Sequence, residues 1–82
     1  MLLRLTSDSL PFWVNVDLRD YNGRWVAVAD LAGERELGLG VFAREAVLDA
    51  VAALRREDRE GLVVDLARKL RAQNDDGAQP HP

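Results

Sequence analysis

Several residues of this chain have the types that catalysis or ligand binding uses, but none has the spacing of an established site. His81, the one histidine, lies between two prolines and has no zinc-binding or catalytic setting. The Gly-Leu-Gly at 38–40 lacks the third glycine and the lysine of phosphate-binding loops. Ser7 and Ser9 have no histidine or lysine base in a recognisable arrangement. We therefore expect no enzymatic activity, no cofactor and no metal.

The composition indicates one small domain. The chain has 82 residues, of which 48% are hydrophobic and 30% charged, with a formal net charge of −3 and no cysteine. This is enough apolar surface for one core, and the lack of thiols fits a reducing compartment, so we expect a cytoplasmic protein. The apolar run at 1–5 is too short for a leader or a membrane span. We expect a single domain over 1–73 and a disordered polar tail over 74–82.

The strongest structural signal is an Asn-Gly dipeptide at 22–23 between two alternating apolar runs, 12–19 and 24–31. A type I′ turn requires positive φ at both central residues, which asparagine and glycine tolerate. The sequence therefore predicts a β-hairpin over 12–31. Its register places Tyr21 opposite Arg24, Leu18 opposite Ala27, and Val14 opposite Leu31.

The other elements follow from turn residues and periodicity. Residues 3–5 form a weak edge strand, 32–34 a turn, and 36–41 a short strand whose glycines admit close backbone approach or a bulge. Apolar residues then recur with the helical period in two segments. We expect an α+β fold: an antiparallel sheet of three or four strands built on the hairpin, packed by two C-terminal helices at about 42–55 and 58–73.

Period-two alternation divides the side chains of the hairpin between two faces. The predicted core face carries Phe12, Val14, Val16, Leu18, Trp25, Ala27, Ala29 and Leu31. On the opposite face, Trp13, Val26 and Val28 either lie under the N-terminal leucines or the second helix, or they contact another protein. On the second interpretation Trp13 is the anchor, and the partner-binding residues are Trp13, Asp17, Arg24, Val26, Val28 and Asp30.

The charges are unevenly distributed along the chain. Residues 55–74 carry six basic and four acidic side chains, several of them three or four apart, such as Arg56 with Glu60 and Asp65 with Lys69. This spacing is typical of a solvated helix face, although contact with nucleic acid or with an anionic protein surface is an alternative. Residues 1–54 are more acidic, so an acidic sheet could instead approach a basic, nucleic-acid-binding partner.

The stretch 12–54 resembles the small HicB-like antitoxin domain. The matching features are strands around the turn at 17–23, the Asp-Leu-Ala-Gly at 30–33, the glycine-bearing strand at 37–40 and a helix that opens with Glu-Ala at 45–46. In place of that family's fourth strand, this chain has a second helical period. The resemblance implies a non-catalytic, often dimeric, RNase H-like sheet that binds and blocks a small ribonuclease toxin.

We expect a small non-enzymatic module that binds and inhibits or regulates another protein, one that processes nucleic acid, without itself contacting nucleic acid or membrane. Two alternatives stay open. The small size, the acidity and the lack of catalytic motifs are also similar to those of phage-encoded inhibitors of host defence, such as anti-CRISPR proteins. The other alternative is a homo-oligomeric structural module, for example a homodimer, with no inhibitory role.

Overall fold

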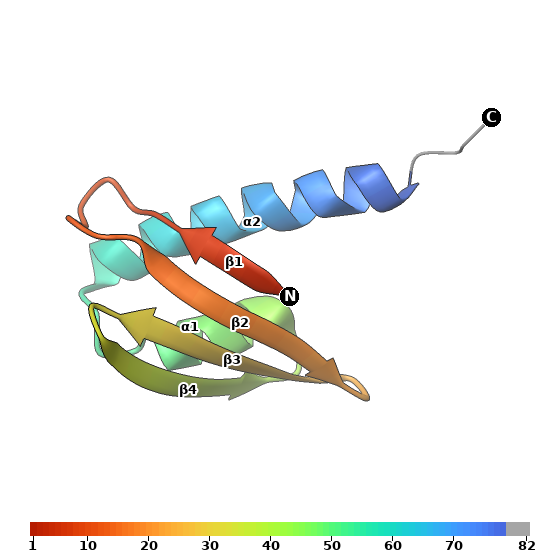
Figure 1. Ribbon diagram of the computed structural model, residues 1–82, viewed down its shortest axis with the longest axis horizontal. Coiled ribbons are helices and arrows are strands. Elements are labelled where there is room, and N and C mark those ends of the chain that lie inside the picture. Colours follow the sequence, from red (N-terminus) through yellow and green to blue (C-terminus); the bar gives the residue numbers. More distant parts are fainter. Residues whose placement is uncertain (79–82) are drawn as a thin grey trace.

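The computed structural model describes residues 1–78, with side chains described through residue 73. The elements are β1 (Leu2–Leu5), β2 (Val14–Tyr21), β3 (Arg24–Leu31), β4 (Glu34–Gly40), α1 (Ala43–Ala50) and α2 (Arg56–Ala78). The four strands form one antiparallel sheet in the order β1-β2-β3-β4 (Figure 1). The predicted α+β architecture, with a sheet built on the hairpin and packed by two helices, is confirmed.

Two tight turns connect the central strands. Asn22 and Gly23 have φ values of 54° and 84°, and Ala32 and Gly33 have values of 54° and 96°, so each turn is left-handed at both central residues. In each case an aspartate two residues before the turn accepts a hydrogen bond from the glycine amide, at 2.9 and 2.8 Å. Both turns therefore use the same local chemistry, although alanine adopts a left-handed φ less readily than asparagine.

The hairpin register follows the prediction over most of its length. Tyr21 pairs with Arg24 and Leu18 pairs with Ala27, as expected. The β2–β3 ladder ends at the pair of Asn15 with Asp30, so the outermost predicted pair, Val14 with Leu31, is not formed. The shorter ladder does not change the face of the sheet on which each side chain lies.

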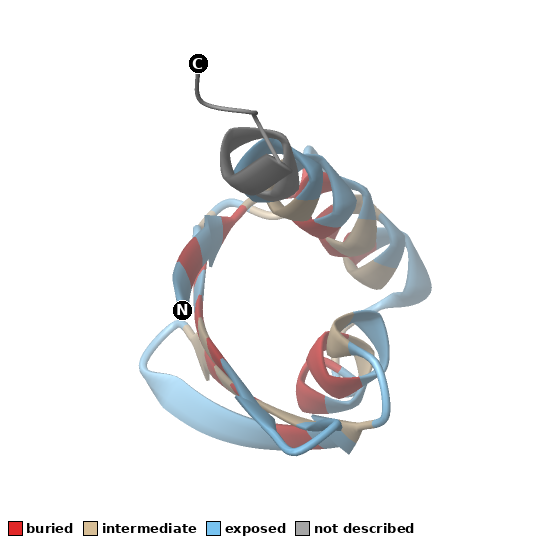
Figure 2. Ribbon diagram, turned by 90° about the vertical axis from the view of Figure 1, so that its right-hand side faces the viewer, coloured by how far each residue is buried: buried red, intermediate tan, exposed pale blue. Residues whose placement is uncertain are grey.

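One face of the sheet, the face that the two helices cover, forms the core (Figure 2). Its buried strand residues are Leu3, Leu5, Val14, Val16, Leu18, Ala27 and Ala29. The helices and the turn after α1 contribute Ala46, Val47, Ala50, Val51, Leu62 and Leu66. Phe12, Trp25 and Leu31 are partly buried at its border, so the predicted core face is confirmed. Burying each of the larger aliphatic side chains stabilises the fold by about 1.5–3 kcal/mol.

The glycines of β4 let α1 lie directly on the sheet. A Cβ atom at Gly38 would stand 2.0 Å from the Ala46 carbonyl oxygen and 2.3 Å from the Ala50 amide nitrogen. One at Gly40 would stand 2.6 Å from the Glu45 Cβ. Of the two roles expected for these glycines, close backbone approach is the one that the structure uses.

The first helix begins without a serine or threonine cap and ends early. The Glu45 carboxylate accepts hydrogen bonds from the amides of Val41 and Phe42, at 3.1 and 3.2 Å, and so satisfies donors that the helix leaves unpaired. The helix stops at Ala50 rather than near 55. The amides of residues 52 and 54 instead bond to carbonyls three residues back, at 3.3 and 3.0 Å, which tightens the chain into turns.

The second helix is longer than predicted. It begins at Arg56 and continues to Ala78, so positions 74–78 of the expected tail belong to the helix. Positions 79–82, including His81, lie outside the described residues. Among residues 1–78, no helix is both long enough and apolar enough to cross a membrane.

Candidate protein-binding face

The face of the sheet opposite the helices, called here the open face, has no covering element among residues 1–78. β1 does not cover it, because β1 joins the sheet beside β2, with Leu2 opposite Asp17. Leu3 and Leu5 point into the core, while Leu2 is 82% exposed. α2 packs on the core side of the sheet (Figure 2). The expectation that the N-terminal leucines or the second helix cover Val26 and Val28 is therefore wrong.

Four aliphatic side chains lie together on the open face. Val26 lies opposite Leu39, and Val28 lies opposite Leu37. The two leucines are 50% and 61% exposed, and the two valines are partly exposed. We call these four residues the aliphatic block. Exposed Val41 and Phe42 follow directly after β4.

The leucines of the aliphatic block were not among the predicted site residues, although the sequence contained the signal. Gly38 and Gly40 were expected to admit close backbone approach, which places them on the face toward the helix. Strand alternation then places Leu37 and Leu39 on the other face. The glycines thus mark the side of β4 that packs on the helix, and the leucines that alternate with them mark the exposed side.

The charge of the open face is opposite in sign to that of the whole chain. The four strands place four arginines and two aspartates there: Arg4, Arg19, Arg24, Arg35, Asp17 and Asp30. The glutamates of β4 alternate with these residues along the strand and therefore lie on the helix side. The hypothesis of an acidic sheet approaching a basic partner is therefore wrong for this face, which carries a net positive charge among the described residues.

Two of the predicted binding residues have clear local roles. Asp17 forms an ion pair with Arg19 at 3.1 Å and lies 3.9 Å from the N-terminal ammonium of Met1. The pKa of Arg19 is raised mainly by its hydrogen bond with the Asp17 carboxylate and, to a smaller extent, by its interaction with Tyr21. Asp30 accepts the Gly33 amide in the second turn. Both carboxylates are thus occupied in supporting the sheet.

Trp13 lies just before the start of β2. It stands at the corner beside β1, with its ring 5.7 Å from the Arg4 guanidinium carbon and 5.9 Å from the Lys69 Nζ. These are cation–π distances. The structure therefore places the five predicted residues of β2 and β3 on one face of the sheet, whereas Trp13, which is 53% exposed, precedes β2 and lies outside the β2–β3 ladder.

A shallow hollow of about 530 Å³ crosses the open face between β1 and β4. Its lining includes three of the predicted residues, Asp17, Val28 and Asp30, together with Leu2 and Arg35. The surface is therefore not flat, and a partner could insert a side chain beside the aliphatic block.

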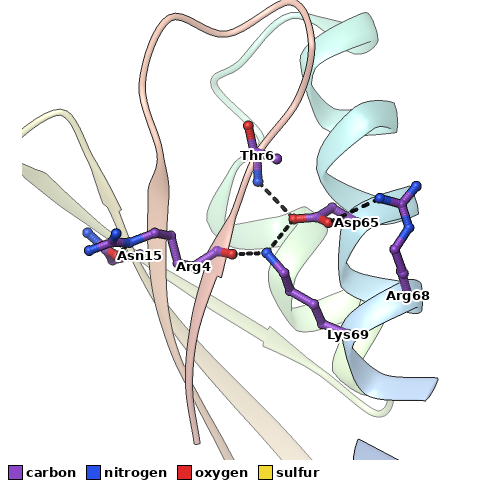
Figure 3. A network of polar contacts seen from close by, with 6 residues as sticks. All are labelled: Arg4, Thr6, Asn15, Asp65, Arg68 and Lys69. Carbon is purple, nitrogen blue, oxygen red and sulfur yellow. Dashed lines mark hydrogen bonds and ion pairs between the residues drawn. The ribbon is translucent and has the colours of Figure 1, made fainter. Parts of the chain in front are cut away.

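A polar network holds α2 against β1 at the edge of the sheet (Figure 3). The Asp65 carboxylate is buried and accepts the Thr6 amide at 2.9 Å and the Lys69 ammonium at 2.8 Å, and Lys69 also donates to the Arg4 carbonyl. Burial opposes ionisation of Asp65, but these hydrogen bonds and the charges of Lys69 and Arg68 outweigh it and lower the pKa. The network fastens segments about sixty positions apart in the chain.

The basic residues of α2 are largely engaged, as expected for a solvated helix face. The predicted pairs of Arg56 with Glu60 and Asp65 with Lys69 are both formed, at 2.9 and 2.8 Å. A second hollow of about 490 Å³ lies between the two helices, and its rim includes Arg56 and Arg59. Arg59 donates to a backbone carbonyl at 3.3 Å. Leu48, Val63 and the exposed Val64 supply the apolar lining of this hollow, and Arg44 is its third arginine.

The serines considered for nucleophilic chemistry hold the loop after β1 to α2. Ser7 and Ser9 bond to each other at 3.1 Å, and Ser9 donates to the buried Asp58. Gly61 admits Ser7, because a Cβ there would stand 2.0 Å from the serine oxygen.

Within the described part of the chain, no group of three or more metal-ligating side chains is present. Comparison of the chain with protein families, characterised proteins and solved structures finds no match.

Proposed function

We propose that this protein is a non-enzymatic module that binds another protein through its open face and thereby regulates it. The observation that supports this most strongly is the exposure of the aliphatic block. Leu37 and Leu39 stand at least half exposed beside two valines, on a sheet face that no other described element covers. Apolar patches rimmed by polar residues are typical of protein interaction sites, and arginine is enriched in such interfaces.

The charge of the open face favours an acidic partner surface. Four arginines against two aspartates surround the aliphatic block, so an acidic patch would be attracted and a basic one repelled. A second copy of this chain presents the same positive face, which disfavours face-to-face dimers. A nucleic-acid-processing partner, such as a ribonuclease toxin, is part of the proposal on the strength of the HicB-like resemblance.

Affinity capture with matched variants tests the proposal. The variant Val26→Ser/Leu39→Ser removes aliphatic contacts from the open face, while Val64→Ser removes a valine on α2 that is 60% exposed. A true partner should be retained by the wild type and by Val64→Ser and lost by the double variant. Trp13→Ala, added to the series, shows whether the site extends to the β1 corner.

The captured protein is then purified and titrated. We expect the double variant to weaken binding by at least tenfold while circular dichroism shows an unchanged fold. If the partner is a nuclease, its activity should fall on addition of the wild type but not of the double variant. Equal retention by the wild type and the double variant would refute the open face as the binding site.

A further inference from the structure

The two edges of the sheet differ in how their outward backbone groups are used. At β1, α2 lies beside the edge, and the Arg4 carbonyl accepts a hydrogen bond from Lys69. At β4, the two-residue turn makes Leu31 and Glu34 a hydrogen-bonded pair, and alternation turns the amides of Arg35, Leu37 and Leu39 outward. The Leu39 amide confirms this direction, because it donates to the Asp49 carboxylate of α1 at 3.0 Å.

The outward groups of Arg35 and Leu37 have no partner among the described residues. We propose that this segment of β4 pairs with an extended strand of the partner protein. This partner strand carries acidic and aliphatic side chains on the open-face side and basic side chains on the helix side. The inference rests on the proposed function and names the element by which the partner docks.

Charge alternation along β4 specifies the character of the added strand. Arg35 and Leu37 lie on the open face, whereas Glu34 and Glu36 lie on the helix side and are exposed. Cross-strand neighbours on the same face interact directly, so opposite charges stabilise a pair and like charges oppose it. An acidic residue beside Arg35, an aliphatic one beside Leu37 and a basic one beside Glu36 therefore form the complementary set.

A second copy of the chain does not provide this complement. Antiparallel self-pairing centred on Arg35 places two arginines opposite each other, and pairing centred on Glu36 places two glutamates opposite each other. Pairing centred on Leu37 requires the Leu39 amide, which Asp49 already occupies. The occupant is therefore a strand of a different protein.

Two blocked seven-residue peptides of identical composition and zero net charge test the proposal. The probe, Thr-Glu-Lys-Leu-Lys-Glu-Thr, segregates its acids and its leucine from its lysines on opposite faces. The control, Thr-Lys-Lys-Leu-Glu-Glu-Thr, mixes both charges on each face. We expect the probe to bind at least tenfold more tightly in an NMR titration, and to slow hydrogen exchange of the Arg35 and Leu37 amides.

Two variants separate backbone pairing from side-chain contact. Leu37→Pro removes an outward amide without removing a ladder hydrogen bond, which an edge strand tolerates, while Leu37→Val keeps the amide. The probe should lose binding to Leu37→Pro and keep it with Leu37→Val. Equal affinity for both peptides, no saturable binding of the probe, undiminished binding to Leu37→Pro, or self-association through this edge would overturn the proposal. A captured partner that Leu37→Pro retains and Val26→Ser/Leu39→Ser loses would leave the open face standing and refute strand pairing alone.

Discussion

The contact between β4 and α1 can be tested by adding a single methyl group at Gly38. In Gly38→Ala the new Cβ would meet the Ala46 carbonyl oxygen at 2.0 Å, whereas ordinary van der Waals contact begins near 3.4 Å. α1 must therefore move outward by about 1.4 Å, because the obstructing atoms belong to its backbone and cannot rotate away. The buried face of α1, which includes Val47, would lose much of its contact with the sheet.

The expected cost lies at the upper end of the range for overpacked cores, about 3 kcal/mol of unfolding free energy. In a domain of this size that corresponds to a fall in Tm of roughly 12–24 °C. Urea and thermal denaturation followed by circular dichroism measure both quantities. Gly23→Ala is the matched control, since no atom lies within 4 Å of its new Cβ and only the strain of a left-handed φ is added, about 1–2 kcal/mol.

A second substitution distinguishes a backbone clash from a side-chain clash. Adding Ala50→Gly to Gly38→Ala removes a side chain from α1 but leaves the Ala50 amide, 2.3 Å from the new Cβ, in place. We therefore expect no recovery of stability in the double variant. A Gly38→Ala protein as stable as the wild type, or full recovery on adding Ala50→Gly, would refute the argument that backbone contact sets the position of α1.

Two further predictions concern the turn at 32–33 and the network that joins α2 to β1. Ala32→Asn should raise the free energy of unfolding by about 0.5–1 kcal/mol, because asparagine tolerates the φ of 54° that alanine adopts under strain; an equal or lower urea midpoint would contradict this. Asp65→Asn should lower it by about 2 kcal/mol near pH 7, since a buried, hydrogen-bonded carboxylate is lost. The lowered pKa of Asp65 means that its contribution is present above the ordinary aspartate pKa of about 3.9 and is lost as the pH falls through the folded value. The gap between wild type and Asp65→Asn in urea denaturation should therefore narrow as the pH falls, and a gap that stays constant with falling pH would refute the electrostatic explanation.

The local elements could be predicted because their causes lie within a few residues. The Asn-Gly dipeptide determines the first turn and hence the register of Tyr21 with Arg24. Period-two alternation determines which hairpin residues enter the core, and helical spacing determines pairs such as Arg56 with Glu60. Each of these depends on bond geometry and spacing alone.

The ends of the helices could not be predicted from spacing. The apolar period continues past Ala50, and it cannot distinguish an α-helix from the tighter turns that follow. The start of α1 also depended on Glu45, whose carboxylate supplies the cap that Phe42 lacks. Boundaries of this kind are set by small differences in hydrogen bonding, which apolar periodicity does not report.

The candidate site was decided by how distant segments pack. By itself the sequence determined a two-faced hairpin with valines on the second face, but it left open whether the N-terminal leucines would cover them. β1 instead joins the sheet edge and is fastened to α2 through Asp65 and Lys69, because pairing satisfies its backbone and buries Leu3 and Leu5. That long-range choice leaves the open face uncovered and places Trp13 at a corner. Burial of apolar area is non-directional, so only the assembled tertiary structure decides which of two apolar faces is covered.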